Sequence, residues 1–266
     1  KSTGNLTFGS GIDGAYSLTI EANADTAFES AVGAGTALSA IDVTAANITL
    51  SDVTTTGTQI YTTTGTIDTN NTYASEGGTI TFAGDVVANS ALVFDTTDGG
   101  QAPGASVIFE GTLNSETGET NTLALTTGTG NVSFNGIVGG NQRLGAVTIN
   151  QVADTTISSA FNAASFNQPN ATAGTGTFLL GGALNTNVSG ITISSATIDI
   201  DAGLVAVGQS INLNAGSGGI ILEGGTIATD GHDTAAGNIE ITSVGAVTIA
   251  SNLDTGGDSQ AAGAGL

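Results

Sequence analysis

The stretch FESAVGAGTALSAIDV at residues 28–43 recurs as FNGIVGGNQRLGAVTI at residues 134–149, and this internal repeat decides the fold. Six pairs of residues keep one common offset: Phe28 and Phe134, Val32 and Val138, Gly33 and Gly139, Leu38 and Leu144, Ile41 and Val147, Val43 and Ile149. A repeated unit of this kind indicates a strand–turn module that stacks on copies of itself, because a single unit cannot bury its own apolar side.

A shorter element also recurs, a triplet of alternating character that ends in Phe and is followed within two residues by Gly. It occurs at residues 6–8, 80–82, 107–109 and 132–134. Three of the four triplets have Thr or Ser in the middle, which on a strand points away from the apolar face. The glycines that follow are Gly9, Gly84, Gly111 and Gly136. We expect them to supply the backbone freedom with which the chain turns a corner.

The distances between these phenylalanines along the chain predict the architecture. Phe8 and Phe28 are 20 residues apart, Phe82 and Phe109 are 27 apart, and Phe109 and Phe134 are 25 apart. Units of this length without a helix fit one coil of a parallel β-solenoid. We expect an all-β parallel β-helix of roughly ten to thirteen coils, a rod roughly 50 to 60 Å long at about 4.8 Å per coil. Residues 1–266 should form one continuous repeat region, a piece of a longer repetitive chain.

The composition supports strands and turns and disfavours helices. The chain has 41 Gly and 2 Pro, no Cys, Met or Trp, and abundant Thr, Ala, Asn and Ser. Thr and Val suit a pleated surface, whereas Gly and Asn suit turns. Hydrophobic residues make up 39% of the chain and alternate in step with the repeats, so we expect an ordered core rather than disorder. Without Cys there is neither a disulfide framework nor a thiolate metal site.

The net charge of −21 comes from 23 acidic residues against Lys1 and Arg143 alone. Such a surface repels phosphate backbones and anionic lipids, which disfavours partners of the nucleic-acid and membrane classes. No stretch approaches the roughly 18 consecutive apolar residues of a membrane span. The near absence of Lys and Arg also leaves little for trypsin-like proteases to cut, as suits a secreted or cell-surface protein.

Several segments resemble very large bacterial surface proteins with filamentous-haemagglutinin-type repeats. The resemblance lies in NVSFNGIVGG followed by RLGAVTI, in VTTTGTQIY at residues 53–61, and in INLNAGSGGIILEGGTIATDG at residues 211–231. It implies a right-handed parallel β-helix. It also implies an extended secreted or surface-anchored fibre that serves adhesion, biofilm matrix or cell contact. The Asn-Pro-Asn motifs of that family's secretion domain do not occur in this sequence.

Aromatic residues are expected in two settings. All nine Phe lie in or beside strand-like segments, where stacked coils would align several of them into core ladders: Phe8, Phe28, Phe82, Phe94, Phe109, Phe134, Phe161, Phe166 and Phe178. The alternative for these rings is a carbohydrate platform. Tyr16, Tyr61 and Tyr73 are the candidates for exposed aromatic contacts, with partial burial at coil corners as the alternative.

Acidic turns are candidate calcium ligands, because carboxylates and turn carbonyls are the hard oxygen ligands that this ion prefers. The candidates are Asp95, Asp98, Asp230, Asp233, Asp254 and Asp258. The nonapeptide GGxGxD pattern and the EF-hand spacing are both absent. Asp that simply caps a solvated turn is the alternative.

An enzymatic role is the competing hypothesis, since parallel β-helices also host polysaccharide lyases and glycosidases. Asp199 and Asp201 alternate with Ile198 and Ile200, share one outward face, and form the best carboxylate pair. We expect no catalysis, because such a pattern more often marks a solvated face. His232, the only histidine, is expected in an exposed loop.

Ice binding is a third alternative, but the Thr runs at residues 54–56 and 62–64 do not repeat once per coil. We therefore expect a structural stalk segment whose partners are neighbouring repeats, other copies of the chain, or surface glycans contacted weakly and many times over.

Overall fold

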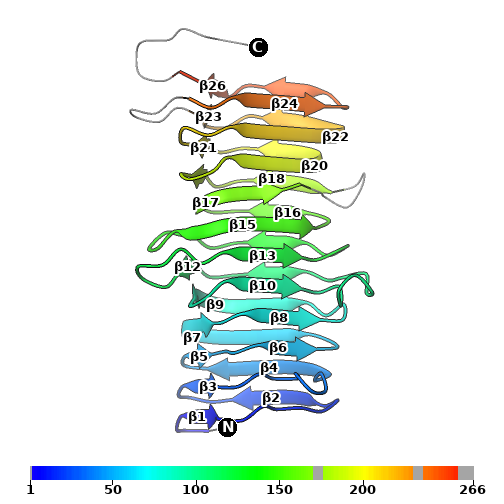
Figure 1. Cartoon of the computed structure of the whole chain (residues 1–266), viewed down its shortest axis with the longest axis vertical. Helices are drawn as coiled ribbons and strands as arrows, with labels where there is room; N and C mark the ends of the chain where they lie inside the picture. The colour runs from blue at the N-terminus through cyan, green and yellow to red at the C-terminus, as the bar shows by residue number, and fades with distance from the viewer. Residues whose placement is uncertain (1, 170–175, 230–235, 257–266) are drawn as a thin grey trace.

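The computed structural model describes residues 2–169, 176–229 and 236–256. These residues contain no helix and form a β-solenoid of about ten turns with parallel stacked coils. In Figure 1 the near strands run left to right and the far strands run right to left while the chain climbs, which is right-handed winding. The predicted fold class is confirmed, with the number of coils at the lower end of the predicted range.

Three parallel sheets run along the rod, named here by their position in Figure 1. The side sheet contains β1 (Leu6–Phe8), β3 (Thr26–Phe28), β5 (Ile48–Thr49), the ends of β7 (Gln59–Thr69) and β9 (Ile80–Ala88), β12 (Leu113–Ser115), the start of β17 (Phe161–Gln168), β19 (Leu184–Thr186), β21 (Leu204–Ala206), β23 (Thr226–Ala228) and β26 (Asn252–Asp254). The rear sheet contains β2 (Ser17–Glu21), β4 (Ala40–Ala45), the starts of β7 and β9, β11 (Val107–Phe109), β14 (Val132–Phe134), β16 (Thr155–Ile157), β18 (Thr177–Leu180), the ends of β20 (Ile191–Ile200) and β22 (Ile211–Leu222), and β25 (Val247–Ile249).

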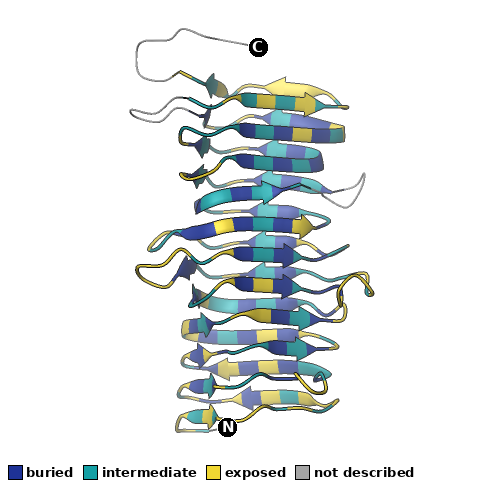
Figure 2. Cartoon of the chain, in the orientation of Figure 1, coloured by how far each residue is buried: buried dark blue, intermediate teal, exposed yellow. Residues whose placement is uncertain are grey.

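The front sheet contains β6 (Val53–Thr55), β8 (Thr72–Ser75), β10 (Leu92–Asp95), β13 (Leu123–Thr126), β15 (Leu144–Gln151), the end of β17, the starts of β20 and β22, and β24 (Ile239–Ser243). Six strands therefore bend around a corner and serve two sheets, since Leu144 at the start of β15 pairs with Ala163 in the side-sheet part of β17. Buried and exposed residues alternate along the strands (Figure 2), as a period of two requires when one face of each sheet lines the core.

The two copies of the repeat that predicted the fold lie on different faces of the rod. Phe28 belongs to the side sheet and Ile41 to the rear sheet. Their counterparts Phe134 and Val147 belong to the rear and front sheets. The repeated unit is thus a local strand–corner–strand module, and the three faces of a coil are similar enough for one module to serve at different corners.

The corner inside this module has the same geometry in both copies. Gly33 has φ 76° and Gly139 has φ 63°, the left-handed region that only glycine adopts without strain. A Cβ at Gly33 would collide with the carbonyl oxygen of Thr54, and one at Gly139 would collide with that of Asn162. The glycine pair in the sequence repeat therefore marks a turn that also packs tightly against the next coil.

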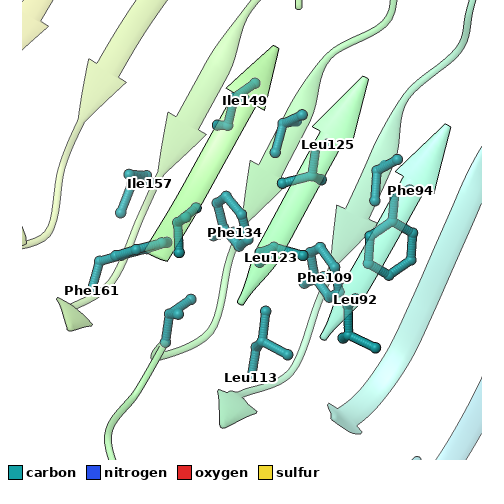
Figure 3. Packing of buried hydrophobic residues seen from close by; sticks show 14 of the residues in the cluster. Leu92, Phe94, Phe109, Leu113, Leu123, Leu125, Phe134, Ile149, Ile157 and Phe161 are labelled. Carbon is teal, nitrogen blue, oxygen red and sulfur yellow. The ribbon is translucent and has the colours of Figure 1, made fainter. Parts of the chain in front are cut away.

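The predicted aromatic ladders are present in the core. Phe82, Phe109 and Phe134 pair in register on the rear sheet. Successive rings stack with centroids 5.4 and 5.3 Å apart and planes within 6° and 3°. Phe94, from the front sheet, meets Phe82 and Phe109 edge to face, with centroids 5.7 and 5.5 Å away. Figure 3 shows Phe94, Phe109 and Phe134 pointing into the interior with leucines around them. Eight of the nine Phe are buried, and Phe8 packs partly buried against Phe28.

The expectation of exposed tyrosines is wrong for two of the three. Tyr61 and Tyr73 are 0% exposed and continue the aromatic stacks, Tyr61 on Phe82 and Tyr73 on Phe94. Burial raises the pKa of both phenols, and the hydroxyl of Tyr61 donates a hydrogen bond to Oε1 of the buried Gln59 at 3.1 Å. A buried amide partner lets a tyrosine occupy a core position, and this pairing was not foreseen.

The role expected for the corner glycines is also wrong. Gly9, Gly84, Gly111 and Gly136 are not among the residues with positive φ, so none needs glycine for its backbone angles. Instead, a Cβ at Gly111 would collide with the carbonyl of Gly84, and one at Gly136 with that of Gly111. Three of these glycines therefore form a column that allows successive coils to approach closely at one corner.

Buried hydroxyl groups line the corner where four consecutive coils leave the front sheet, after β6, β8, β10 and β13. Each hydroxyl donates to a backbone carbonyl further along its own coil: Thr55 to Gly57 at 2.6 Å, Ser75 to Gly78 at 2.5 Å, Thr96 to Ala105 at 2.7 Å and Thr127 to Gly130 at 3.0 Å. These four side chains are at most 1% exposed. They satisfy carbonyls that the bend removes from the strand ladder, as buried polar groups require.

Trypsin provides a test of this packing, because Arg143 is the only internal basic residue. Its Nη1 donates to the carbonyls of Ala163 and Asn185, both at 2.8 Å, and the following Leu144 is 1% exposed. We expect the native protein to resist trypsin and the unfolded chain to be cut internally once, after Arg143. Digestion across a urea series should show two fragments that appear only through the unfolding transition. Equal cleavage rates in buffer and in urea would contradict the packing of this loop.

Candidate functional surfaces

Acidic side chains on the outer faces of the strands are kept apart from one another. Asp42 on the rear sheet lies between Thr19 and Ile60 of the neighbouring coils. Asp68 on the side sheet lies between Thr49 and Val87 in the same way. Like charges directly opposite each other would destabilise a sheet, and this spacing avoids them.

Other acidic, amide and hydroxyl side chains connect successive coils at the corners. A chain of such contacts lies where the chain enters the rear sheet. Ser106 Oγ accepts a hydrogen bond from Asn131 N at 3.1 Å, and Asn131 Oδ1 accepts one from Asp154 N at 3.1 Å. Asp154 Oδ1 in turn accepts one from Thr177 N at 2.8 Å. Asp85 Oδ1 does the same for Thr112 N at 2.8 Å on entry to the side sheet. Part of the acidity therefore caps backbone N–H groups of the next coil.

Three of the six candidate calcium ligands lie in described segments. Asp95 already accepts hydrogen bonds from Thr97 N at 2.8 Å, Thr97 Oγ1 at 2.6 Å and Gly99 N at 3.2 Å. Asp98 is exposed at the tip of that turn with φ 51°. Asp254 accepts from Gly256 N at 3.0 Å on the side sheet.

The other three candidates, Asp230, Asp233 and Asp258, lie outside the described residues, as does His232. In the described ranges, no three His, Cys, Asp or Glu side chains gather into a group that could hold a metal ion. Calcium binding stays a prediction from the sequence. It requires that a chelator lower the melting temperature.

The carboxylate pair proposed for catalysis lies at the end of β20, with Asp199 on the outer face of the strand and Asp201 in the first position after it. Ile198 and Ile200 are 0% exposed, whereas Asp199 is partly exposed and Asp201 fully so. The neighbours of Asp199 on adjacent coils are Leu179 and Ile221, so its column offers no second acid or base. Desolvation by these surroundings, and then the charge of Asp201, raises the pKa of Asp199.

This raised pKa predicts how stability depends on pH. A carboxyl group whose pKa is higher in the folded than in the unfolded state disfavours folding at neutral pH, and the penalty disappears as pH falls through the folded pKa. We expect Asp199→Asn to raise the urea midpoint slightly at pH 7, with a gain that shrinks on acidification. Urea titrations of both proteins between pH 7 and pH 3 measure this. Asp42→Asn, also on the rear sheet, is the control. A gain for Asp199→Asn that grows on acidification would contradict the assignment.

Tyr16 is an exposed aromatic residue, and the Thr runs are partly buried. Tyr16 is 74% exposed, as predicted, and its ring lies against Gly14 near the first coils. The Thr runs at residues 54–56 and 62–64 each have a buried middle residue and an exposed last one, so they form no flat Thr array.

The front sheet carries a polar column that the sequence analysis missed. Thr148, Asn167, Thr192 and Asn212 occupy equivalent positions on four consecutive coils and alternate hydroxyl with amide. All four are partly exposed. The alternation is hidden in the sequence because the coils that separate these residues differ in length.

Comparison with known proteins identifies no relative: no family model, no curated protein and no solved structure matches this chain. The class of protein defined by the fold is therefore that of β-solenoid repeat proteins. Within the described ranges, no helix is long and apolar enough to cross a membrane.

Proposed function

We propose that this chain is a rigid segment of an extracellular fibre or stalk, of the filamentous-haemagglutinin type, that serves adhesion, biofilm matrix or cell contact. The observation that carries the proposal is the hydrophobic core, which runs without interruption from Ile20 to Ile227 through successive coils. Each coil contacts only its neighbours, so length and stiffness are the properties that such an architecture supplies directly. The acid-rich, Lys- and Arg-poor surface supports exposure outside the cell.

Stacking on neighbouring repeats or on other copies of the chain is part of this proposal. On the last described coil, Val247 and Ile249 are 45% and 44% exposed, although their equivalents Ile220 and Leu222 one coil earlier are fully buried. Open strand edges and apolar side chains of this kind favour pairing with a further coil. A neighbouring repeat would therefore bury the same positions that each coil buries within the rod.

The proposal is tested by locating the protein on or outside the producing cells and by measuring the shape of the isolated protein. We expect antibody to this region to label intact producing cells or their secreted material. Electron microscopy and small-angle scattering of the isolated protein should show a rod about 50 Å long per copy, from about ten turns at about 4.8 Å each. Recovery of the protein only from the cell interior would overturn the proposal.

A β-helix carbohydrate-active enzyme is the second candidate, and the raised pKa of Asp199 favours it, since a general acid needs such a shift. It predicts turnover of a neutral or acidic polysaccharide that is lost in Asp199→Asn and in Asp201→Asn. A broad glycan panel without turnover would eliminate it.

A further inference from the structure

The polar column of the front sheet has hydrogen-bonding capacity that the protein does not use. None of the side chains of Thr148, Asn167, Thr192 and Asn212 makes a hydrogen bond within the described part of the chain. A hydroxyl offers one donor and two acceptors, and a primary amide offers two donors and a carbonyl. The column therefore presents both donors and acceptors once per coil, about every 4.8 Å.

A second polar column runs beside it. Ser194 and Asn214 pair in register two residues beyond Thr192 and Asn212, and their side chains are also free of hydrogen bonds within the described part. The column of four residues and the pair beside it together form a polar strip along the rod axis. We call these six residues the amide strip.

The amide strip is free of charge in a strongly acidic protein. β13, β15, β17 and β22 contain no acidic residue, and the only one in β20, Asp199, lies on the rear sheet. The acid-free stretch of the front sheet ends at the exposed Glu240 of β24, which lies opposite Asn212. In a chain with a net charge of −21, the absence of acidic residues from several consecutive front-sheet strands needs an explanation. A surface that approaches a neutral polar polymer closely gains from the absence of charge, because a desolvated carboxylate would weaken contact.

We propose that the amide strip binds an extended neutral polysaccharide whose chain lies along the rod axis. The sugar units of an extended glycan follow one another at about the spacing of the coils, so successive hydroxyl groups meet successive Thr and Asn side chains. Sugar hydroxyls donate and accept hydrogen bonds, as do the groups of the strip. Each contact is weak, and affinity comes from many contacts along one polymer.

Charge argues for this class of glycan over the others. The net charge of −21 over the whole chain repels anionic polysaccharides. Cationic polymers would be attracted to the acidic side chains elsewhere on the rod rather than to the neutral strip. Binding through the strip is therefore expected to persist in high salt, where contacts between exposed charges are screened.

This inference rests on the proposed adhesive role of the fibre and names a neutral polysaccharide as the partner that the fibre binds. The test is co-sedimentation of the full chain with microcrystalline cellulose, chitin and insoluble mannan in 0.5 M salt, a concentration at which exposed charges are screened over roughly 4 Å. We expect the unaltered protein to bind at least one of them. Asn167→Asp together with Asn214→Asp keeps shape and adds charge, and should weaken binding about tenfold or more, as the loss of two hydrogen bonds implies. Asn214 lies between the uncharged Ser194 and Thr242, so the added charge meets no acid on the neighbouring coils.

The matched control is Asn23→Asp with Asn252→Asp, the same chemical change at two exposed positions outside the front sheet. It should bind as the unaltered protein does. The uncharged pair Thr148→Val with Thr192→Val should also weaken binding, which separates lost hydrogen bonds from added repulsion. Circular dichroism confirms that all variants fold.

Two results would overturn the inference: no binding to any of the three neutral glycans, or equal binding by the strip variants and the control. Preference for an anionic polysaccharide would count against it as well. These results leave the fibre proposal standing if the protein is a rod outside the cell. Glycan binding by a protein confined to the cell interior would instead remove the fibre proposal alone.

Discussion

Phe109→Ala lowers the free energy of unfolding by about 3 to 5 kcal/mol, the cost typical of removing a buried aromatic ring. Phe109 is 1% exposed and stacks between Phe82 and Phe134, while Phe94 meets its edge. The truncation removes two stacked contacts and one edge contact and leaves a cavity in mid-rod. The coils on either side cannot close it, because their own strands hold them in register.

Urea denaturation followed by circular dichroism measures the effect. Ile108→Ala on the same strand is the matched control, because Ile108 points outward and is only partly buried. We expect the control to cost about 1 kcal/mol or less, as surface substitutions do. Equal losses for the two variants would show that Phe109 does not anchor the core. If the transition broadens into two steps, the rod has separated into halves at this coil, as repeat proteins can.

The sequence predicted the fold well because coil stacking leaves a local signature. The strand triplets at residues 80–82, 107–109 and 132–134 do lie above one another. Their spacing therefore measured the coil length correctly. The first triplet, at residues 6–8, belongs to the side sheet instead, and its Phe8 stacks on Phe28. A short apolar triplet specifies a strand without specifying which of three similar faces it joins.

Contacts between coils were predicted less well, because the paired residues are 18 or more positions apart in the strand ladders and coil lengths vary. Tyr61 looked exposed because the ring on which it stacks, Phe82, belongs to the next coil and is paired with it only in the fold. The amide strip was missed for the same reason. Thr148 and Asn167 are equivalent only once the register of β15 and β17 is known.

Gly136→Ala should destabilise the rod by about 3 kcal/mol, at the upper end of the cost of overpacking. The added methyl group would collide with the carbonyl of Gly111 on the coil below, which is backbone and cannot rotate away. Relief requires the two coils to separate at this corner. That separation would strain the hydrogen bond from Asn135 N to Phe109 O, 2.9 Å long, beside the collision.

Gly9→Ala is the control that distinguishes this mechanism from a general intolerance of the motif. Gly9 follows the same Phe-ending triplet, yet its nearest contact is a side-chain oxygen of Glu29, 3.6 Å from where a Cβ would lie. Neither glycine has a positive φ, so neither substitution strains the backbone of the folded protein. Alanine also reduces the conformational freedom of the unfolded chain, which should make Gly9→Ala neutral or slightly stabilising. Thermal melts of the two variants measure the loss of melting temperature. A large loss for Gly136→Ala alone means that glycine is required at residue 136 for close approach between coils. Equal losses for the two variants would instead mean that the turn itself requires glycine.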